Sequence, residues 1–123
     1  MFGGQTTGTP FLGDFWEFTE DGWRELTGEP KPSPRNFYAT AFDGDAARLV
    51  LFGGNTADGA VNDVWFFDSA ANAWSQQSLR GDASSARYGH DAVWLPGRRS
   101  LLVWGGNDGS QDLNDVWELS LPA

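Results

Sequence analysis

The sequence predicts an all-β fold built from repeated units, and three observations carry this prediction. Glycine doublets recur at Gly3-Gly4, Gly53-Gly54 and Gly105-Gly106, in steps of 50 and 52 residues. Short apolar runs lead into the second and third doublets. An Asp-x-Trp triplet follows each doublet at nearly the same interval: Asp14-Phe15-Trp16, Asp63-Val64-Trp65 and Asp115-Val116-Trp117. A fixed period of this order is the signature of a repeat architecture.

The middle unit is complete, and it predicts four strands, which we designate A to D in chain order. They cover residues 37–43, 48–52, 63–68 and 73–79. Asp43-Gly44 falls between the first two, where residues that tolerate turn dihedrals are expected. The frequent glycines and the seven tryptophans suit many short strands better than long helices.

The flanking units repeat parts of this pattern. Arg87 aligns with Arg35, because each arginine precedes its glycine doublet by 18 residues. Pro96-Gly97 then marks the turn that corresponds to Asp43-Gly44. The segments 55–61 and 107–113 are rich in Gly, Asn and Asp, and we expect them to be surface loops.

The strands at residues 49–52 and 101–104 are apolar throughout rather than alternating. A continuous apolar strand indicates that both faces of its sheet are covered. Stacked sheets explain this, because each sheet of a propeller lies between two others. The periodic tryptophans are then expected to pack between sheets rather than to stack on sugars.

In order, these motifs resemble the kelch repeat: Arg-x-x-His or Tyr, an apolar strand ending in Gly-Gly, Asn-Asp-Val-Trp, and a later tryptophan. The resemblance covers nearly the whole chain and implies four-stranded antiparallel propeller blades with strand A innermost and the doublet at the end of strand B. It divides the chain into a partial blade at 1–34 (strands B, C and D), a complete blade at 35–86, and a partial blade at 87–123 (strands A, B and C). The structural motif residues are Gly3, Gly4, Asp14, Trp16, Trp23, Gly53, Gly54, Asp63, Trp65, Trp74, Gly105, Gly106, Asp115 and Trp117.

About two and a half blades cannot close a ring, since the resemblance implies six or seven. Open blades would expose apolar faces, so we expect homo-oligomerisation to complete the propeller. A symmetric ring needs a whole number of blades from each chain. A dimer with three blades per chain or a trimer with two blades per chain gives six blades, and a tetramer with two blades per chain gives eight. The other interpretation is that the chain is a natural or engineered fragment of a longer propeller.

Composition excludes several partners. Eight Lys and Arg against 17 Asp and Glu give a net charge of −9, which repels nucleic acid and anionic membrane surfaces. No run of about 20 apolar residues predicts a membrane span. The chain has no cysteine, so disulfides and thiolate metal sites are excluded, and the compartment stays open.

The chemical inventory argues against an enzyme. Some kelch propellers resemble galactose oxidase, whose copper site needs histidines and a cysteine joined to a tyrosine, but this chain has one histidine and no cysteine. A serine hydrolase would have only His90 as a base. The Asn and Asp residues at 55–58 and 107–112 lack the spacing of a calcium loop. We therefore expect no metal and no cofactor, and we assign Asp63 and Asp115 to backbone hydrogen bonds at the start of strand C.

The sequence thus predicts a non-enzymatic scaffold that self-assembles and acts as a protein or ligand interaction module. The alternative is a carbohydrate-binding or enzymatic propeller with a channel site shared between chains. The expected partners of this chain are other copies of itself and, in addition, another protein or a glycan. The candidate binding residues face the channel near the start of the inner strands, although the two arginines also suit hydrogen bonds between blades: Arg35, Tyr38, Arg87, Tyr88 and His90.

Overall fold

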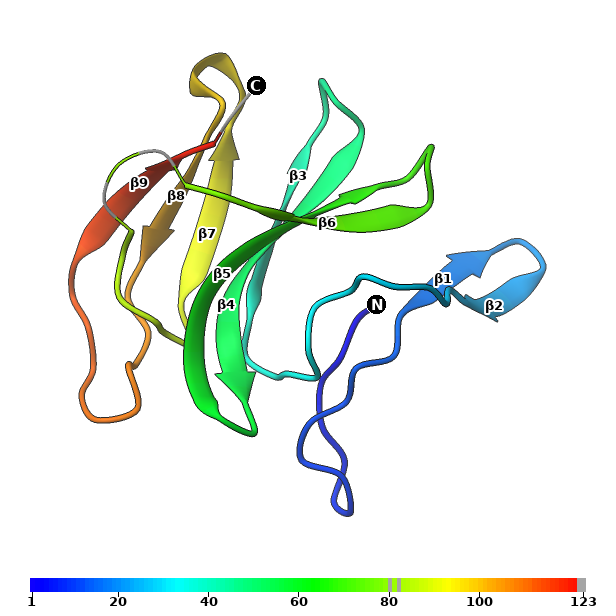
Figure 1. The fold of residues 1–123 in the computed structure, drawn as a ribbon, viewed down its shortest axis with the longest axis horizontal. Helices are drawn as coiled ribbons and strands as arrows, with labels where there is room; N and C mark the ends of the chain where they lie inside the picture. Colours follow the sequence, from blue (N-terminus) through cyan, green and yellow to red (C-terminus); the bar gives the residue numbers. More distant parts are fainter. Residues whose placement is uncertain (80, 82, 122–123) are drawn as a thin grey trace.

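The structure is a computed structural model that describes residues 1–79, 81 and 83–121. Three antiparallel sheets follow one another along the chain and lie side by side (Figure 1). The prediction of an all-β fold is confirmed. We call the three sheets the first, second and third blade in chain order.

The second blade is a complete four-stranded sheet. Its strands are β3 (Ala39–Asp43), β4 (Arg48–Thr56), β5 (Gly59–Asp68) and β6 (Ala73–Gln77), and they are ordered β3-β4-β5-β6. Every neighbour in this sheet is also the next strand in sequence, so the blade is a simple meander joined by tight turns. The turn before β4 is closed by Asp43, whose carboxylate accepts from two following backbone N–H groups.

The first blade contains β1 (Trp16–Thr19) and β2 (Gly22–Glu25). An antiparallel bridge between Phe2 and Phe15 extends this sheet towards the N-terminus. Phe2 precedes the first glycine doublet, so this bridge occupies the place that β4 has in the second blade. Within the described residues, the first blade has no further strand on the inner side of this bridge.

The third blade contains β7 (Asp91–Leu95), β8 (Ser100–Trp104) and β9 (Val116–Ser120), in that order across the sheet. A short 3-10 helix, η1 (Pro96–Arg98), forms the turn between the first two strands. Arg99 ends the turn with a φ of 50°. The turn expected at Pro96-Gly97 is therefore present. The last two residues of the third unit lie outside the described residues.

One element differs from the expectation. Residues 55–61 are not a loop, because β4 continues to Thr56 and pairs with β5, with Thr56 opposite Gly59. The register shifts between Phe52 and Gly54. Both glycines of the doublet have positive φ, 69° and 114°, a backbone region that glycine enters without the penalty of a Cβ atom. The doublet therefore makes a bulge in the second blade, although β8 ends before its own doublet as expected.

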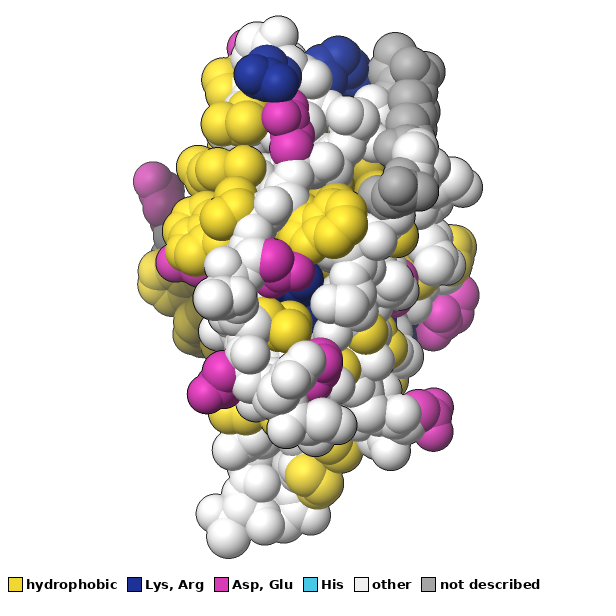
Figure 2. Space-filling model, turned by 90° about the vertical axis from the view of Figure 1, so that its left-hand side faces the viewer, with side chains coloured by type: hydrophobic (Ala, Val, Ile, Leu, Met, Phe, Trp, Pro, Cys, Tyr) yellow, Lys and Arg dark blue, Asp and Glu magenta, His cyan; other side chains and the backbone are white. Residues whose placement is uncertain are grey.

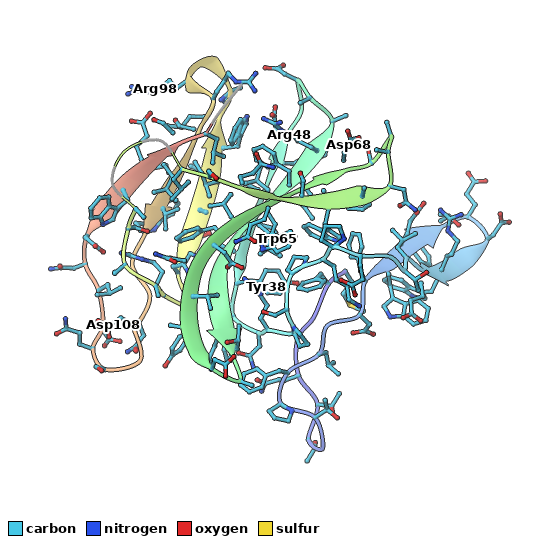
Figure 3. All side chains as sticks on the ribbon, in the orientation of Figure 1. Tyr38, Arg48, Trp65, Asp68, Arg98 and Asp108 are labelled. Atoms are coloured by element: carbon cyan, nitrogen blue, oxygen red, sulfur yellow. The ribbon has the colours of Figure 1, made fainter. Side chains whose placement is uncertain are left out.

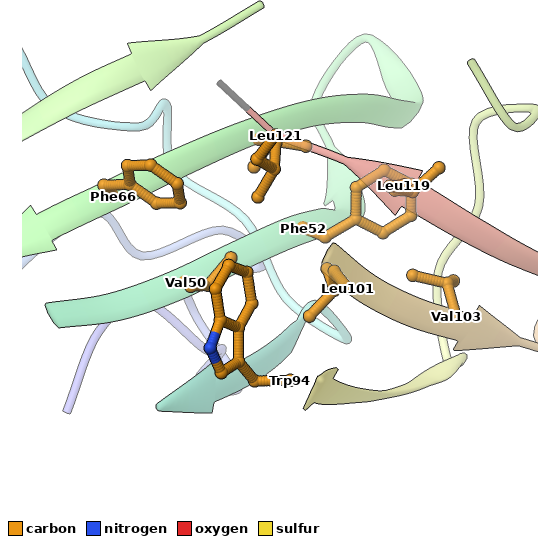
Figure 4. Packing of buried hydrophobic residues seen from close by; sticks show 9 residues of the cluster. Val50, Phe52, Phe66, Trp94, Leu101, Val103, Leu119 and Leu121 are labelled. Atoms are coloured by element: carbon orange, nitrogen blue, oxygen red, sulfur yellow. The ribbon is translucent and has the colours of Figure 1, made fainter. Parts of the chain in front are cut away.

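Two apolar cores lie between the blades. Buried residues of the second blade, including Val50, Phe52 and Phe66, pack against Trp94 and Leu101 of the third (Figure 4). A second cluster joins the first blade to the opposite face of the second blade and contains Phe2, Phe15, Leu51, Trp65, Phe67 and Trp74. The second blade is thus covered on both faces, which explains why its middle strand is apolar throughout.

In the part of the chain that the structure describes, no helix has the length and apolar character needed to span a bilayer.

Candidate binding surface between the second and third blades

The start of each inner strand is fixed by a buried arginine. Arg35 is fully buried and donates two hydrogen bonds to the carboxylate of Asp63, at 2.6 and 2.9 Å. It also donates to the carbonyl oxygen of Gly53 and to two oxygens of Ser33. The indole Nε1 of Trp65 donates to the same carboxylate at 2.8 Å. We call this arrangement the arginine clamp.

The third blade repeats the arginine clamp. Arg87 donates to Asp115 at 2.7 and 2.9 Å, to the carbonyl of Gly105 and to two oxygens of Ser85. Trp117 donates to Asp115 at 2.7 Å. Each clamp joins residues of a single sheet, since the arginine precedes its inner strand and the carboxylate belongs to the same blade. The aspartates bind these side chains in addition to the backbone hydrogen bonds that the sequence led us to expect, which each makes at its own residue.

The electrostatics follow from these contacts. Burial alone would raise the pKa of Asp63, but the hydrogen bonds and positive charge of Arg35 outweigh it and hold the pKa below its usual value. Hydrogen bonds from Arg87 and then from Trp117 hold the pKa of Asp115 far below its usual value. Both carboxylates are therefore charged at neutral pH and balance their arginines.

A different pair of side chains connects neighbouring blades. Tyr38 donates its hydroxyl to the carbonyl oxygen of Phe2 in the first blade (Figure 3). His90 contacts the carbonyl oxygen of Phe52 in the second blade through Nε2 at 3.0 Å. Burial lowers the pKa of His90 to about 4, so the ring is neutral at pH 7 and Nε2 carries the proton. Burial likewise raises the pKa of Tyr38.

An open hollow of about 510 Å³ lies between the second and third blades at the loop end. Exposed Phe37 and half-buried Tyr88 line it, with ring centroids 6.3 Å apart. Phe37 has a φ of 51°, an unusual value for a bulky residue, and its carbonyl accepts from the N–H of Gly89 at 2.8 Å. That bond holds the two blades together beside the hollow.

The opposite wall of the hollow is polar and comes from the loop before β9. Asn107 forms an isolated bridge with Tyr88, and its side-chain amide donates to Asp112 at 3.0 Å. The remaining lining residues are Gly89, Gly106 and Leu113. Two aromatic rings beside an amide and a carboxylate can bind a ligand through apolar contact and hydrogen bonds together.

Only one of the five candidate binding residues lines this hollow, namely Tyr88. Arg35 and Arg87 lie in the clamps, and Tyr38 and His90 bridge blades. The sequence reasoning did not single out Phe37, because its backbone conformation is invisible in the residue pattern. Residues 107–113 were expected to form a surface loop, and the Asn and Asp residues within it were considered only as calcium ligands. Ligand binding by any of these residues stays a prediction.

The residue groups considered for metal binding do not converge. Among residues 1–79, 81 and 83–121, no three or more His, Asp or Glu side chains gather where they could hold an ion. Asp108 lies at the tip of the loop between β8 and β9 (Figure 3). Its carboxylate accepts from the N–H groups of Ser110 and Gln111, at 2.8 and 2.9 Å. Those bonds shape the loop.

The comparisons with known proteins agree with the geometry. Residues 1–123 match the family described as the KLHDC2/KLHL20/DRC7 Kelch-repeats domain. The chain is similar to dynein regulatory complex subunit 7 of Chlamydomonas reinhardtii, with 36% identity over 78 residues, covering 63% of this chain and 7% of that protein. It is 36% identical over 109 residues to multiple epidermal growth factor-like domains protein 8 of Homo sapiens, covering 85% of this chain and 4% of that protein.

A third relative is Adagio-like protein 3 of Oryza sativa subsp. japonica, which is 37% identical over 106 residues, covering 82% of this chain and 16% of that protein. The chain thus spans a small part of the length of each of these relatives. The repeated clamps, the stacked sheets and the match over the full length lead to one conclusion. The chain belongs to the kelch-repeat family.

Proposed function

We propose that the chain is a non-enzymatic kelch interaction module that self-associates into a propeller and binds a protein partner at the hollow beside Tyr88. The proposal of self-association rests on two apolar faces, one at each end of the stack of blades. Each of these faces repeats one half of an interface that the chain already forms internally.

The first open face belongs to the first blade. Trp16, Phe18 and Trp23 project from the same side of the β1–β2 hairpin, because Phe18 is the register partner of Trp23 and Trp16 lies two residues away. Phe18 and Trp23 are 68% and 57% exposed, and their rings contact each other at a centroid distance of 5.1 Å. Met1 adds to this face and lines a hollow with the two tryptophans.

The second open face belongs to the third blade. Its exposed hydrophobic residues are Val93, Trp104 and Val116, of which Val116 is 65% exposed. Figure 2 views the molecule from the side on which the third blade lies, and it shows hydrophobic side chains gathered among scattered carboxylates. Clustered exposed apolar residues of this kind mark interaction surfaces.

The repeat relates these two faces to the internal interfaces. Counted from the Asp-x-Trp triplets, Trp16 and Phe18 correspond to Trp65 and Phe67, which pack against the first blade. On the other side, Trp104 and Val116 correspond to Phe52 and Val64, which pack against the third blade. The third blade of one chain can therefore contact the first blade of another in the way that consecutive blades contact within the chain. Burying each large apolar side chain contributes about 2 kcal/mol.

The test is the absolute mass in solution, measured by light scattering over a range of concentrations. Stacking three whole blades from each chain predicts a dimer, which makes a ring of six blades. A trimer or a tetramer would instead indicate that terminal blades merge, with two blades from each chain and rings of six or eight. Replacing Phe18 and Trp23 together with Ser should shift the mass towards the monomer. Phe42→Ser is the matched control, because Phe42 is also exposed but belongs to the middle blade. A wild-type chain that stays monomeric at every concentration would contradict self-association.

The choice of a non-enzymatic role rests on how the reactive groups are used. His90, the single histidine, is buried and bonded to the carbonyl of Phe52. Both clamp aspartates are neutralised by arginine. None of these side chains is presented to a substrate in the open hollow.

A carbohydrate is the second candidate ligand. The observation that favours it is the combination of the Phe37 and Tyr88 rings with the amide of Asn107 and the carboxylate of Asp112 around one hollow. Sugars use aromatic faces and polar hydrogen-bonding groups together. A glycan array probed with the wild type and with Tyr88→Ala distinguishes a sugar ligand from a protein partner. A glycan signal that is lost in Tyr88→Ala supports a sugar. Protein capture without any glycan signal supports a protein partner.

A further inference from the structure

The hollow beside Tyr88 is lined by two aromatic rings that come from neighbouring blades. Phe37 precedes β3 of the second blade, and Tyr88 precedes β7 of the third. Phe37 is 56% exposed, so most of its surface is not used for packing within the chain. The face of an aromatic ring carries partial negative charge and attracts a cation that lies within about 6 Å of the ring centre.

The polar wall of the hollow carries a carboxylate with one free oxygen. Asp112 lies on the loop between β8 and β9, and its Oδ1 atom accepts from the side-chain amide of Asn107 at 3.0 Å. An isolated bridge between the same two residues fixes their backbones across the loop. Among the described residues, none donates to Oδ2 and none forms an ion pair with Asp112. The carboxylate is therefore held in place while half of it remains available to a ligand.

The surroundings of the hollow are negative. The segments at residues 3–13, 53–62 and 104–114 turn at the same end of the molecule (Figure 1). None of these segments contains a lysine or an arginine, and their charged residues are Asp58, Asp108 and Asp112. The electrostatic field at this end therefore attracts a cation and repels an anion.

The chain already holds one arginine between an aromatic ring and a carboxylate, at the opposite end of the same two blades. The guanidinium carbon of Arg48 lies 3.8 Å from the centre of the Phe66 ring and 5.9 Å from that of Trp94. Its Nε donates to Asp43 at 3.0 Å. Figure 3 shows Arg48 at the end of the molecule away from Asp108. A guanidinium suits such a site because its flat face covers a ring while its edge donates to a carboxylate, which a lysine ammonium cannot do.

We propose that the hollow binds an arginine side chain of a partner protein. The guanidinium contacts the rings of Phe37 and Tyr88 and donates to the free oxygen of Asp112. This inference rests on the proposed function, in which the hollow binds a protein, and it adds the chemical group that the protein must present. The hollow is lined only by residues of the second and third blades, so the inference is independent of the apolar faces proposed for self-association.

The test uses the tripeptide N-acetyl-Gly-Arg-Gly amide as the probe, titrated into the full chain and followed by NMR. A matched tripeptide carries neutral citrulline in place of the arginine. We expect the backbone amides of Gly89 and Asn107 to shift with saturation in the arginine peptide. The citrulline peptide should bind at least about threefold more weakly, because a contact between a cation and a ring and an exposed ion pair each add a modest factor.

Three variants locate the site. Asp112→Asn should weaken binding of the arginine peptide at least about threefold. Asp58→Asn is the matched control, because it makes the same change in net charge at an exposed position between β4 and β5, and it should leave the affinity unchanged. Tyr88→Leu should weaken binding more than Tyr88→Phe does, because only phenylalanine keeps a ring. Thermal unfolding of each variant checks that the fold is retained.

Several results would overturn the proposal. Equal affinity for the two peptides would show that the positive charge is not recognised. Absence of saturation, or equal affinity for the wild type and Asp112→Asn, would show that the hollow does not bind the guanidinium. An equal loss in Asp58→Asn and Asp112→Asn would show that the net charge of the protein attracts the peptide without a site.

Further measurements separate this inference from the proposed function. A captured partner protein that is lost with Tyr88→Ala and retained with Asp112→Asn would keep the hollow as the binding site and overturn the arginine. A monomeric wild type that still discriminates between the peptides would refute self-association alone. Light scattering of Asp112→Asn should give the mass of the wild type. A fall in mass would show that the arginine belongs to a second copy, and it would overturn the assignment to another protein.

Discussion

The buried histidine makes the stability of this protein depend on pH in a defined window. His90 is buried and uses Nε2 to bond the carbonyl of Phe52. Its Nδ1 atom is buried without a partner among the described residues. Protonation would place a second N–H at that position with no acceptor, beside the positive charge of Arg87 and only partly offset by Asp91. The folded protein therefore resists protonation.

The magnitude follows from the pKa. Burial lowers the pKa of His90 from 6.5 to about 4, and each unit corresponds to about 1.4 kcal/mol. Because the unfolded chain binds the proton first, the contribution to stability is complete above pH 6.5 and is lost as the pH falls towards 4. We expect the free energy of unfolding to decrease by about 3 kcal/mol across this window. Below pH 4 the histidine adds nothing further.

The assay is urea unfolding followed by tryptophan fluorescence, at several pH values between 4 and 7.5 and at one protein concentration. His90→Gln is the matched variant, because a glutamine amide can donate to the carbonyl of Phe52 and does not titrate. The difference between the two stability curves isolates the histidine from the carboxylates. The clamp aspartates have pKa values below their usual range, so they act at lower pH. Equal pH dependence in the wild type and in His90→Gln would refute the reasoning.

The clamps and the glycine doublets give two further predictions. Asp63→Asn should lower the free energy of unfolding by about 3 kcal/mol, because it leaves a buried arginine without its counter-charge. Asp115→Asn should lower it less, because the Asp115 side chain is 39% exposed whereas that of Asp63 is 20% exposed. Asp14→Asn should lower it by under about 1 kcal/mol. Equal losses in urea titrations of the three variants would contradict this order. Gly53→Ala and Gly105→Ala both place an alanine at a φ near 70°, which costs about 1–2 kcal/mol of backbone strain. Only the Cβ at position 53 also collides with the neighbouring blade, because it lies 2.8 Å from the carbonyl oxygen of Arg87. The melting temperature should therefore fall further for Gly53→Ala, and equal melting temperatures would show that the contact between blades relaxes freely.

The sequence predicted the repeat and the all-β fold because both depend on periodic features. Apolar strands, turn residues and the Asp-x-Trp triplets recur with a period of about 50 residues, and the physics of strand burial interprets them directly. The arginine clamp was also within reach. Arg35 and Asp63 are separated by 28 residues, as are Arg87 and Asp115, and this equal spacing of opposite charges is visible in the sequence.

The features that escaped prediction depend on backbone conformation. Phe37 lines the hollow and has a positive φ. The neighbouring residues give no signal from which this backbone conformation could be predicted. The strand β4 passes through Gly53-Gly54 because the doublet shifts the register instead of ending the pairing. In the third blade, the same doublet is followed by an irregular loop. The local sequence of the doublet is the same in both cases, so the difference arises in the residues that follow it.

The bonds between blades give the stack a polarity. The N–H groups of Gly4 and Gly54 donate to the carbonyls of Arg35 and Arg87 in the blade that follows, while Tyr38 and His90 reach back to the blade before. The leading and trailing sides of a blade are consequently different surfaces, and contact between them is heterologous. Heterologous contacts do not limit the number of copies by themselves. If the chain self-associates as proposed, the rotation from one blade to the next will therefore determine whether the copies close into a ring or extend as a filament.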